Sequence, residues 1–84
     1  MFYYLIVTLR TENFTTDILP AHFEYLEKLR EAEILKLSGP FTDKTGGAYL
    51  VTCENAAAAE KVAALDPLIS SGASAATVRE WAAK

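Results

Sequence analysis

Residues 2–9 read FYYLIVTL, a run of β-branched and aromatic side chains that is typical of a β-strand. Successive side chains of a strand point to opposite faces, and both sets are largely apolar here: Phe2, Tyr4, Ile6 and Thr8 against Tyr3, Leu5, Val7 and Leu9. A strand that is apolar on both faces has to be covered on both, which indicates a central position in a sheet.

The rest of the chain predicts two helices and three more strands. Apolar residues at helical spacing predict a helix that is capped by one of residues 15–17 (Thr, Thr or Asp) and ends near Glu31. Asn55 is a good N-cap for a second helix, over residues 56–65. Strands are predicted over residues 34–38, 48–53 and 77–81. The middle one of these three is again apolar on both faces, whereas the other two are mixed and suit the edges of a sheet.

The resulting order of elements, β-α-β-β-α-β, predicts a ferredoxin-like α+β fold. Right-handed crossovers give a four-stranded antiparallel sheet with strand order 4-1-3-2 and both helices on one face. This order places in the centre the two strands that are apolar on both faces. The uncovered face would carry Tyr3, Leu5, Tyr49 and Val51, and such a patch predicts a homodimer, sheet against sheet, that could assemble further.

The composition argues against several classes of protein. The 84 residues suit one domain, and a net charge of −3 argues against nucleic acid as a partner, because nucleic-acid-binding domains present a basic face. The apolar runs are too short for a membrane span, and no signal peptide is recognised. One cysteine and one histidine fall short of a zinc site or a disulfide framework. We therefore expect a cytoplasmic protein without metal, flavin or nucleotide cofactor.

The topology also gathers polar residues that are far apart in the sequence. The end of the first strand, the start of the first helix, the hairpin between the middle strands and the end of the second helix all fall at one rim of the sheet. That rim collects Arg10, His22, Ser38, Gly39, Pro40, Gly46, Gly47 and Asp66. The only imidazole of the chain therefore shares one end of the sheet with a loop carboxylate.

These rim residues have structural as well as functional interpretations. His22 lies on the apolar face of its helix and is either a packed histidine or a proton-transfer group, a role that suits imidazole at neutral pH. Asp66 precedes a proline and is a good N-cap for a short helix, while its second oxygen leaves room for a bond to His22. Arg10 is either solvated or bound to a substrate carboxylate. Ser38 either ends its strand or contacts substrate, and Tyr49 is interpreted as a core or interface residue.

Several short segments occur in an order and at a spacing that resemble the YciI-like proteins of the dimeric α+β barrel superfamily. They are Pro20-Ala-His22, Leu37-Ser-Gly-Pro40, Gly47-Ala-Tyr-Leu-Val51, Asp66-Pro67-Leu68 and Val78-Arg-Glu-Trp81. The resemblance covers nearly the whole chain, so residues 1–84 are expected to form a single YciI-like domain.

The resemblance implies a role for His22 and Asp66 as a catalytic acid–base dyad beside a cleft. It implies that Ser38 is a polar contact beside the dyad. Ser38, Gly39 and Arg10 are the predicted substrate-binding residues. The implied activity is a cofactor-independent elimination, like that of a dehydrochlorinase, or an isomerisation of a small carboxylated or lactone metabolite. The alternative is a non-catalytic module for small-ligand binding or assembly with the same dimeric barrel.

Overall fold

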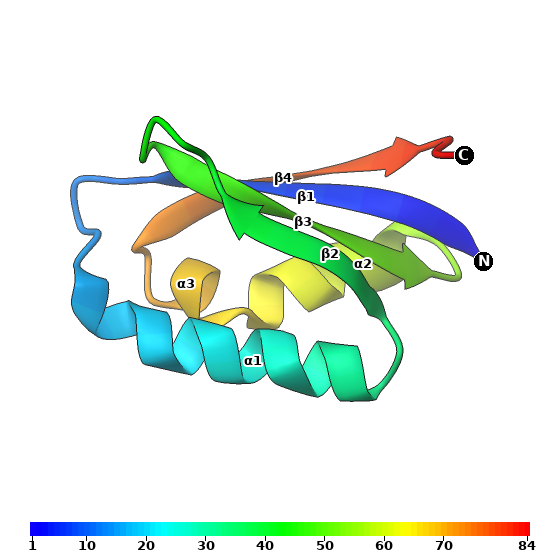
Figure 1. Ribbon diagram of the computed structural model, residues 1–84, viewed down its shortest axis with the longest axis horizontal. Coiled ribbons are helices and arrows are strands. Elements are labelled where there is room, and N and C mark those ends of the chain that lie inside the picture. The colour runs from blue at the N-terminus through cyan, green and yellow to red at the C-terminus, as the bar shows by residue number, and fades with distance from the viewer.

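The strands and helices occur in the predicted order in the computed structural model, which describes residues 1–84 (Figure 1). Their bounds are β1 (Phe2–Arg10), the 3-10 turn η1 (Thr16–Ile18), α1 (Leu19–Glu31), β2 (Leu35–Pro40), β3 (Gly46–Cys53), α2 (Ala56–Leu65), α3 (Pro67–Ser70) and β4 (Ser74–Trp81). One antiparallel sheet holds the strands in the order β2-β3-β1-β4, the predicted order read from the other edge. All helices lie against one face of this sheet, so the ferredoxin-like α+β fold is confirmed (Figure 1). No helix combines the length and apolarity that a bilayer crossing requires.

The hydrophobic core lies between the sheet and the helices. The two central strands supply its middle, where Ile6 of β1 and Val51 of β3 are completely buried. Leu26 and Leu29 pack onto them from α1. α2 contributes alanines such as Ala59, whose small side chains let the helix approach the sheet closely.

The two faces of β3 differ from the prediction. Residues that pair across antiparallel strands point to the same side of the sheet, and Tyr49 pairs with Ile6 while Val51 pairs with Tyr4. Both β3 residues therefore lie beneath the helices, and the prediction that they belong to the open face with Tyr3 and Leu5 is wrong. The large hydrophobic side chains that remain exposed on the open face are Tyr3, Leu9, Leu37 and Trp81.

The two longer helices begin in different ways. α2 starts as predicted, because the side chain of Asn55 accepts a hydrogen bond from the backbone N–H of Ala58 at 2.8 Å. α1 has no side-chain cap, so the predicted cap within residues 15–17 is not observed. Instead η1 leads into the helix, and Pro20 occupies the first turn, where its missing N–H leaves no donor unsatisfied. This entry places His22 one turn into α1, on its buried side.

Main chains approach one another closely where β3 begins. A Cβ atom on Gly46 would overlap the carbonyl oxygen of Thr8, and one on Gly47 would lie 2.7 Å from the carbonyl oxygen of Gly39. Only glycine fits two such positions without moving the neighbouring strands. At this end of the sheet the two glycines therefore add no side chains. Space remains between the sheet and the start of α1.

Candidate functional site

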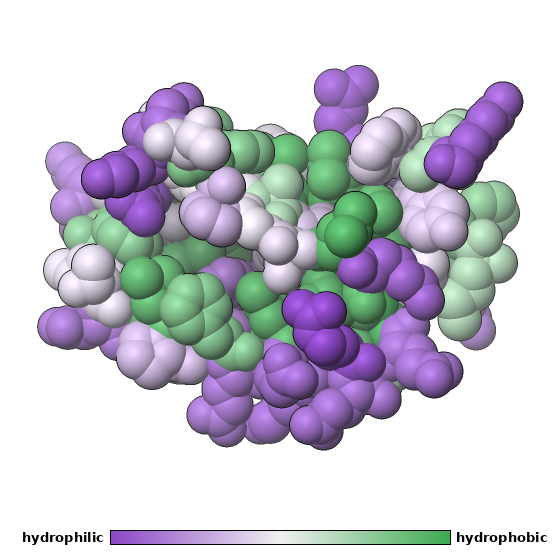
Figure 2. All heavy atoms as spheres, in the orientation of Figure 1, coloured by the Kyte–Doolittle hydropathy of each residue, from purple (hydrophilic) through white to green (hydrophobic).

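A cavity of about 400 Å³ opens at this end of the sheet, a volume that suits a small organic molecule. Figure 2 shows hydrophobic side chains around a hollow between α1 and the sheet, while the outer surface of α1 is hydrophilic. The cavity is lined by all but one of the residues predicted to gather at the rim: Arg10, His22, Ser38, Gly39, Pro40, Gly46 and Gly47. The exception is Asp66, which is completely buried behind His22.

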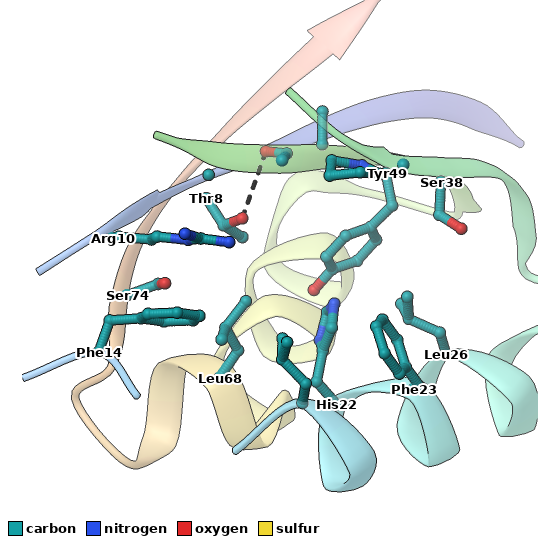
Figure 3. Close-up of a pocket in the computed structure, with 16 residues that line it drawn as sticks. Thr8, Arg10, Phe14, His22, Phe23, Leu26, Ser38, Tyr49, Leu68 and Ser74 are labelled. Atoms are coloured by element: carbon teal, nitrogen blue, oxygen red, sulfur yellow. Dashed lines mark hydrogen bonds between the residues drawn. The ribbon is translucent and has the colours of Figure 1, made fainter. Parts of the chain in front are cut away.

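His22 and Asp66 form a buried hydrogen bond beside the cavity. Nδ1 of His22 lies 2.9 Å from Oδ1 of Asp66, and the two side chains are 11% and 0% exposed. An ionised carboxylate only accepts hydrogen bonds, so Nδ1 carries the proton and donates it. In its neutral form His22 then holds its lone pair on Nε2. His22 lines the cavity, and Nε2 is the ring nitrogen that Asp66 leaves free (Figure 3).

Asp66 receives three hydrogen bonds, which occupy both of its carboxylate oxygens. Oδ1 accepts from His22 and from the backbone N–H of Leu68 at 2.9 Å, and Oδ2 accepts from the hydroxyl of Tyr49 at 3.0 Å. The bond to Leu68 is an N-cap, since Asp66 precedes Pro67 at the start of α3. The structural and the functional interpretation of Asp66 therefore describe the same carboxylate, which caps one helix and orients the imidazole of another.

Tyr49 is a site residue that the sequence did not reveal. It is 3% exposed, it lines the cavity, and its hydroxyl reaches Asp66. Burial and the negative charge of Asp66 strongly raise the pKa of Tyr49, so it stays a neutral phenol that donates its hydrogen bond. The signal that could have found it is strand register, because a partner on the inner face of β1 fixes the direction of the Tyr49 side chain.

A second tyrosine lies in the same electrostatic environment. The hydroxyl of Tyr25 donates to the backbone carbonyl of Val62 at 2.6 Å, tying α1 to α2. Burial, together with the charge of Asp66, raises the pKa of Tyr25 to about 12. Both phenols therefore keep their protons in the folded protein at pH values where exposed tyrosines ionise.

The raised pKa of Tyr25 predicts a loss of stability at alkaline pH. In the unfolded chain Tyr25 loses its proton near pH ~10, whereas in the folded chain it does so at about 12. The unfolded state then binds fewer protons, so the free energy of unfolding should fall as the pH rises from about 10 towards 12. Urea unfolding at a series of pH values measures this slope, which Tyr25→Phe should make shallower. Tyr3→Phe, which removes a phenol from the open face, is the matched control, and equal slopes in both variants would contradict the prediction.

Further residues from loops and edge strands complete the cavity wall. The Arg10 guanidinium stacks on the ring of Phe14 at 4.1 Å, and the Thr8 hydroxyl donates to the carbonyl of Gly47 at 3.3 Å (Figure 3). Phe14, Thr8 and Ser74 of β4 all line the cavity without a motif that marks them in the sequence. Ser38 and Gly39 are present as predicted, on the β2 side.

The remaining reactive side chain lies elsewhere. Cys53 is at the opposite end of β3, paired with Phe2, and burial raises the pKa of its thiol. No group of three or more His, Cys, Asp and Glu side chains is arranged to hold a metal ion. An imidazole that is hydrogen-bonded to a buried carboxylate, as His22 is to Asp66, is an arrangement capable of proton transfer.

This chain resembles known proteins in both its sequence and its fold. The family model of the YCII-related domain matches residues 1–82. The uncharacterized protein YjpA of Bacillus subtilis (strain 168) is 40% identical over 84 residues, which cover 100% of this chain and 99% of YjpA. Among solved structures, 5-chloro-2-hydroxyhydroquinone dehydrochlorinase (TftG) from Burkholderia phenoliruptrix AC1100, in complex with 2,5-dihydroxybenzoquinone, superimposes with a TM-score of 0.80. The superposition covers 98% of this chain and 95% of TftG, and the two sequences are 22% identical. This likeness shows that the two proteins share a fold.

Proposed function

This chain belongs to the YCII-related family, and on that basis we propose that it is a small enzyme in which His22 moves a proton to and from a carbon acid. The observation that carries the proposal is the bond between Nδ1 of His22 and the buried Asp66, which leaves Nε2 as the acceptor at the cavity wall. A general base needs this arrangement, a lone pair facing the substrate and a partner that fixes the ring.

In the proposed reaction, Nε2 of His22 takes a proton from a carbon next to a carbonyl or lactone group. The electrons of the broken C–H bond form a C=C bond. In an elimination, a leaving group departs with its bonding electrons from the adjacent carbon as the C=C bond forms. In an isomerisation, His22 returns the proton to another carbon of the same molecule. Asp66 stabilises the imidazolium that forms in between. Neither outcome changes the oxidation state of the protein, and neither requires an electron acceptor.

The comparison with TftG supports this class of reaction. By its name TftG is a dehydrochlorinase, and the molecule bound in its structure is a dihydroxybenzoquinone, a ring with carbonyl groups. We propose a related substrate class for this chain, namely small carboxylated rings or lactones, held between the β2 edge and α1. Ser38 and Gly39 would contact such a molecule from β2.

A non-catalytic ligand-binding module is the competing proposal, and one observation favours it. The side chain of His22 is only 11% exposed, so a molecule could occupy the cavity without approaching Nε2 closely.

For an enzyme and for a binding module alike, we propose a homodimer formed through the open sheet face, where Tyr3, Leu37 and Trp81 are exposed. Light scattering should then give about twice the chain mass of 9.2 kDa.

Nitrogen NMR of the only histidine tests the proposed base directly. In protein labelled with ¹⁵N in the imidazole, neutral His22 should show a proton on Nδ1 and a lone pair on Nε2. Unsaturated lactones or hydroxybenzoquinones should shift the Nε2 signal, and Asp66→Asn should mix the two tautomers because its amide can donate as well as accept. A mixed tautomer in the wild type, together with an Nε2 signal that no compound moves, would leave the ligand-binding module as the better account.

A further inference from the structure

We infer that the cavity wall opposite His22 is a carboxylate-binding subsite, formed by Arg10 and Ser74, for a small unsaturated organic acid. The inference rests on the proposed function for the orientation of the substrate, because the acid group would bind at this wall and the reacting carbon would face His22. The subsite itself can be tested by binding alone.

Ser74 provides the first observation. Its residue is 4% exposed, its Oγ atom is buried, and it is the one buried side-chain polar atom without a hydrogen-bond partner. A hydroxyl that has left water without a new partner destabilises the fold, so such a group needs an explanation. Ser74 lines the cavity, and its hydroxyl points into it (Figure 3). An acceptor atom on a bound molecule would complete its hydrogen bonding once the exposed Arg10 side chain beside it turns to bind the same molecule.

Arg10 provides the second observation, which concerns charge. Its side chain reaches across the cavity wall next to Ser74, with the guanidinium stacked on Phe14 (Figure 3). None of the ion pairs in the chain involves Arg10; they join His22 to Asp66, Lys28 to Glu24 and Arg30 to Glu27. No Asp or Glu lines the cavity, although the net charge of the chain is −3. The cavity therefore offers an unpaired positive charge within an acidic protein.

The backbone holds these two groups together. Arg10 and Ser74 are paired residues of the antiparallel strands β1 and β4, so their side chains leave the sheet on the same side. The backbone positions that carry the guanidinium and the hydroxyl are thus held next to each other by strand register rather than by a flexible loop. Two neighbouring donors of which one is charged match the two oxygens of a carboxylate.

Across the cavity lie the groups of the proposed chemistry. In Figure 3, Arg10 and Ser74 enter from one side, His22 and Tyr49 enter from the other, and the apolar side chain of Leu68 lies between them. An acid with its carboxylate on Arg10 and Ser74 would place its carbon skeleton over Leu68 and a more distant C–H group at Nε2 of His22. The favoured ligand is therefore a planar acid in which a short unsaturated segment separates the carboxylate from the reacting carbon.

Calorimetric titration of the intact protein with benzoate and trans-cinnamate, each compared with its primary amide, tests the subsite. At pH 8, where ordinary imidazole is neutral, at least one acid should bind about tenfold or more tightly than its amide. Arg10→Gln should remove about tenfold of that affinity. Lys61→Gln, which makes the same change of net charge on the exposed side of α2, should leave it unchanged. Added salt should weaken the binding of the acid.

Ser74→Ala separates a ligand contact from a purely structural hydroxyl. It should weaken the binding of the acid several-fold, about as expected for one hydrogen bond to a charged group. It should not lower the melting temperature, because it removes a buried donor that has no partner. Weaker folding with unchanged affinity would overturn the role of Ser74.

The remaining outcomes separate this inference from the proposed chemistry. If the preference for the acid disappears in Arg10→Gln and survives in His22→Gln, the subsite is supported whether or not the protein is an enzyme. If the preference follows His22 instead, if acid and amide bind alike, or if neither acid binds, the subsite is overturned. The ¹⁵N signals of His22 would still report separately on the base.

Discussion

His22→Gln should reduce proton exchange at the carbon acid by about 10²–10⁴-fold, the contribution typical of a positioned general base. In D₂O the wild-type protein should incorporate deuterium next to the carbonyl group of a β,γ-unsaturated lactone, because His22 returns a solvent deuteron in place of the proton it removed. Glutamine keeps an amide that can donate to Asp66, but it has no lone pair on a basic nitrogen. Mass spectrometry of the recovered compound measures the exchange without knowledge of the product.

Two comparisons make this result specific to His22. The variant should melt near the wild-type temperature and should still bind whichever of benzoate and trans-cinnamate the wild type binds, which shows that the cavity is intact. Lys61→Gln, which changes an exposed side chain of α2 outside the cavity, should retain the exchange. Exchange by His22→Gln at the wild-type rate, or no exchange above buffer by the wild type with any compound of the series, would refute the proposed base.

Asp66→Ala should lower the free energy of unfolding by about 3–5 kcal/mol, a large part of the ~5–15 kcal/mol that stabilises an ordinary domain. The substitution leaves three buried donors without an acceptor: Nδ1 of His22, the N–H of Leu68 and the hydroxyl of Tyr49. Each of them has already given up its water, so each loses a bond that nothing replaces. For a chain of this size, the melting temperature should fall by more than about 12 °C.

Asn55→Ala provides the matched control for that experiment. Asn55 also caps a helix through its side chain, but it is exposed and holds only the N–H of Ala58. Its loss should cost about 1 kcal/mol, the usual contribution of an N-cap. The difference between the two variants in urea unfolding therefore measures the buried network around Asp66, apart from helix capping. A similar cost for both would mean that the hydrogen bonds from His22 and Tyr49 to Asp66 add nothing to the stability of the folded state.

Much of the fold follows from the sequence because its strongest signals are local. The central position of β1 follows from its apolarity on both faces, and the start of α2 follows from Asn55. The order of the elements then limits the topology so far that it places most rim residues at one end of the sheet. A turn is likewise recognisable over residues 42–47, although β3 already begins within it, at Gly46.

The sequence does not predict the site roles of Tyr49 and Ser74, because these roles depend on how distant strands pair. Tyr49 was assigned to the wrong face because its direction depends on the register between β3 and β1, which no residue of β3 encodes alone. Ser74 was overlooked because the segment Ser-Ala-Ala that opens β4 has weak strand propensity, so the strand was predicted to begin three residues later, at Thr77. Its place beside the cavity becomes recognisable only from its pairing with Arg10 across β1 and β4.

The double use of Asp66 has a consequence for how this site can change over evolutionary time. Functional residues commonly destabilise the protein that contains them. A lineage that loses its activity is therefore free to replace them with more stabilising residues. Asp66 is an exception, since it holds α3, His22 and Tyr49 in place whether or not a reaction occurs. A descendant that abandoned proton transfer should therefore retain the aspartate under selection for folding alone, while the histidine drifts. Under the proposed function, replacement of the histidine rather than of the aspartate among relatives of this chain would mark the lineages that have lost the proton transfer.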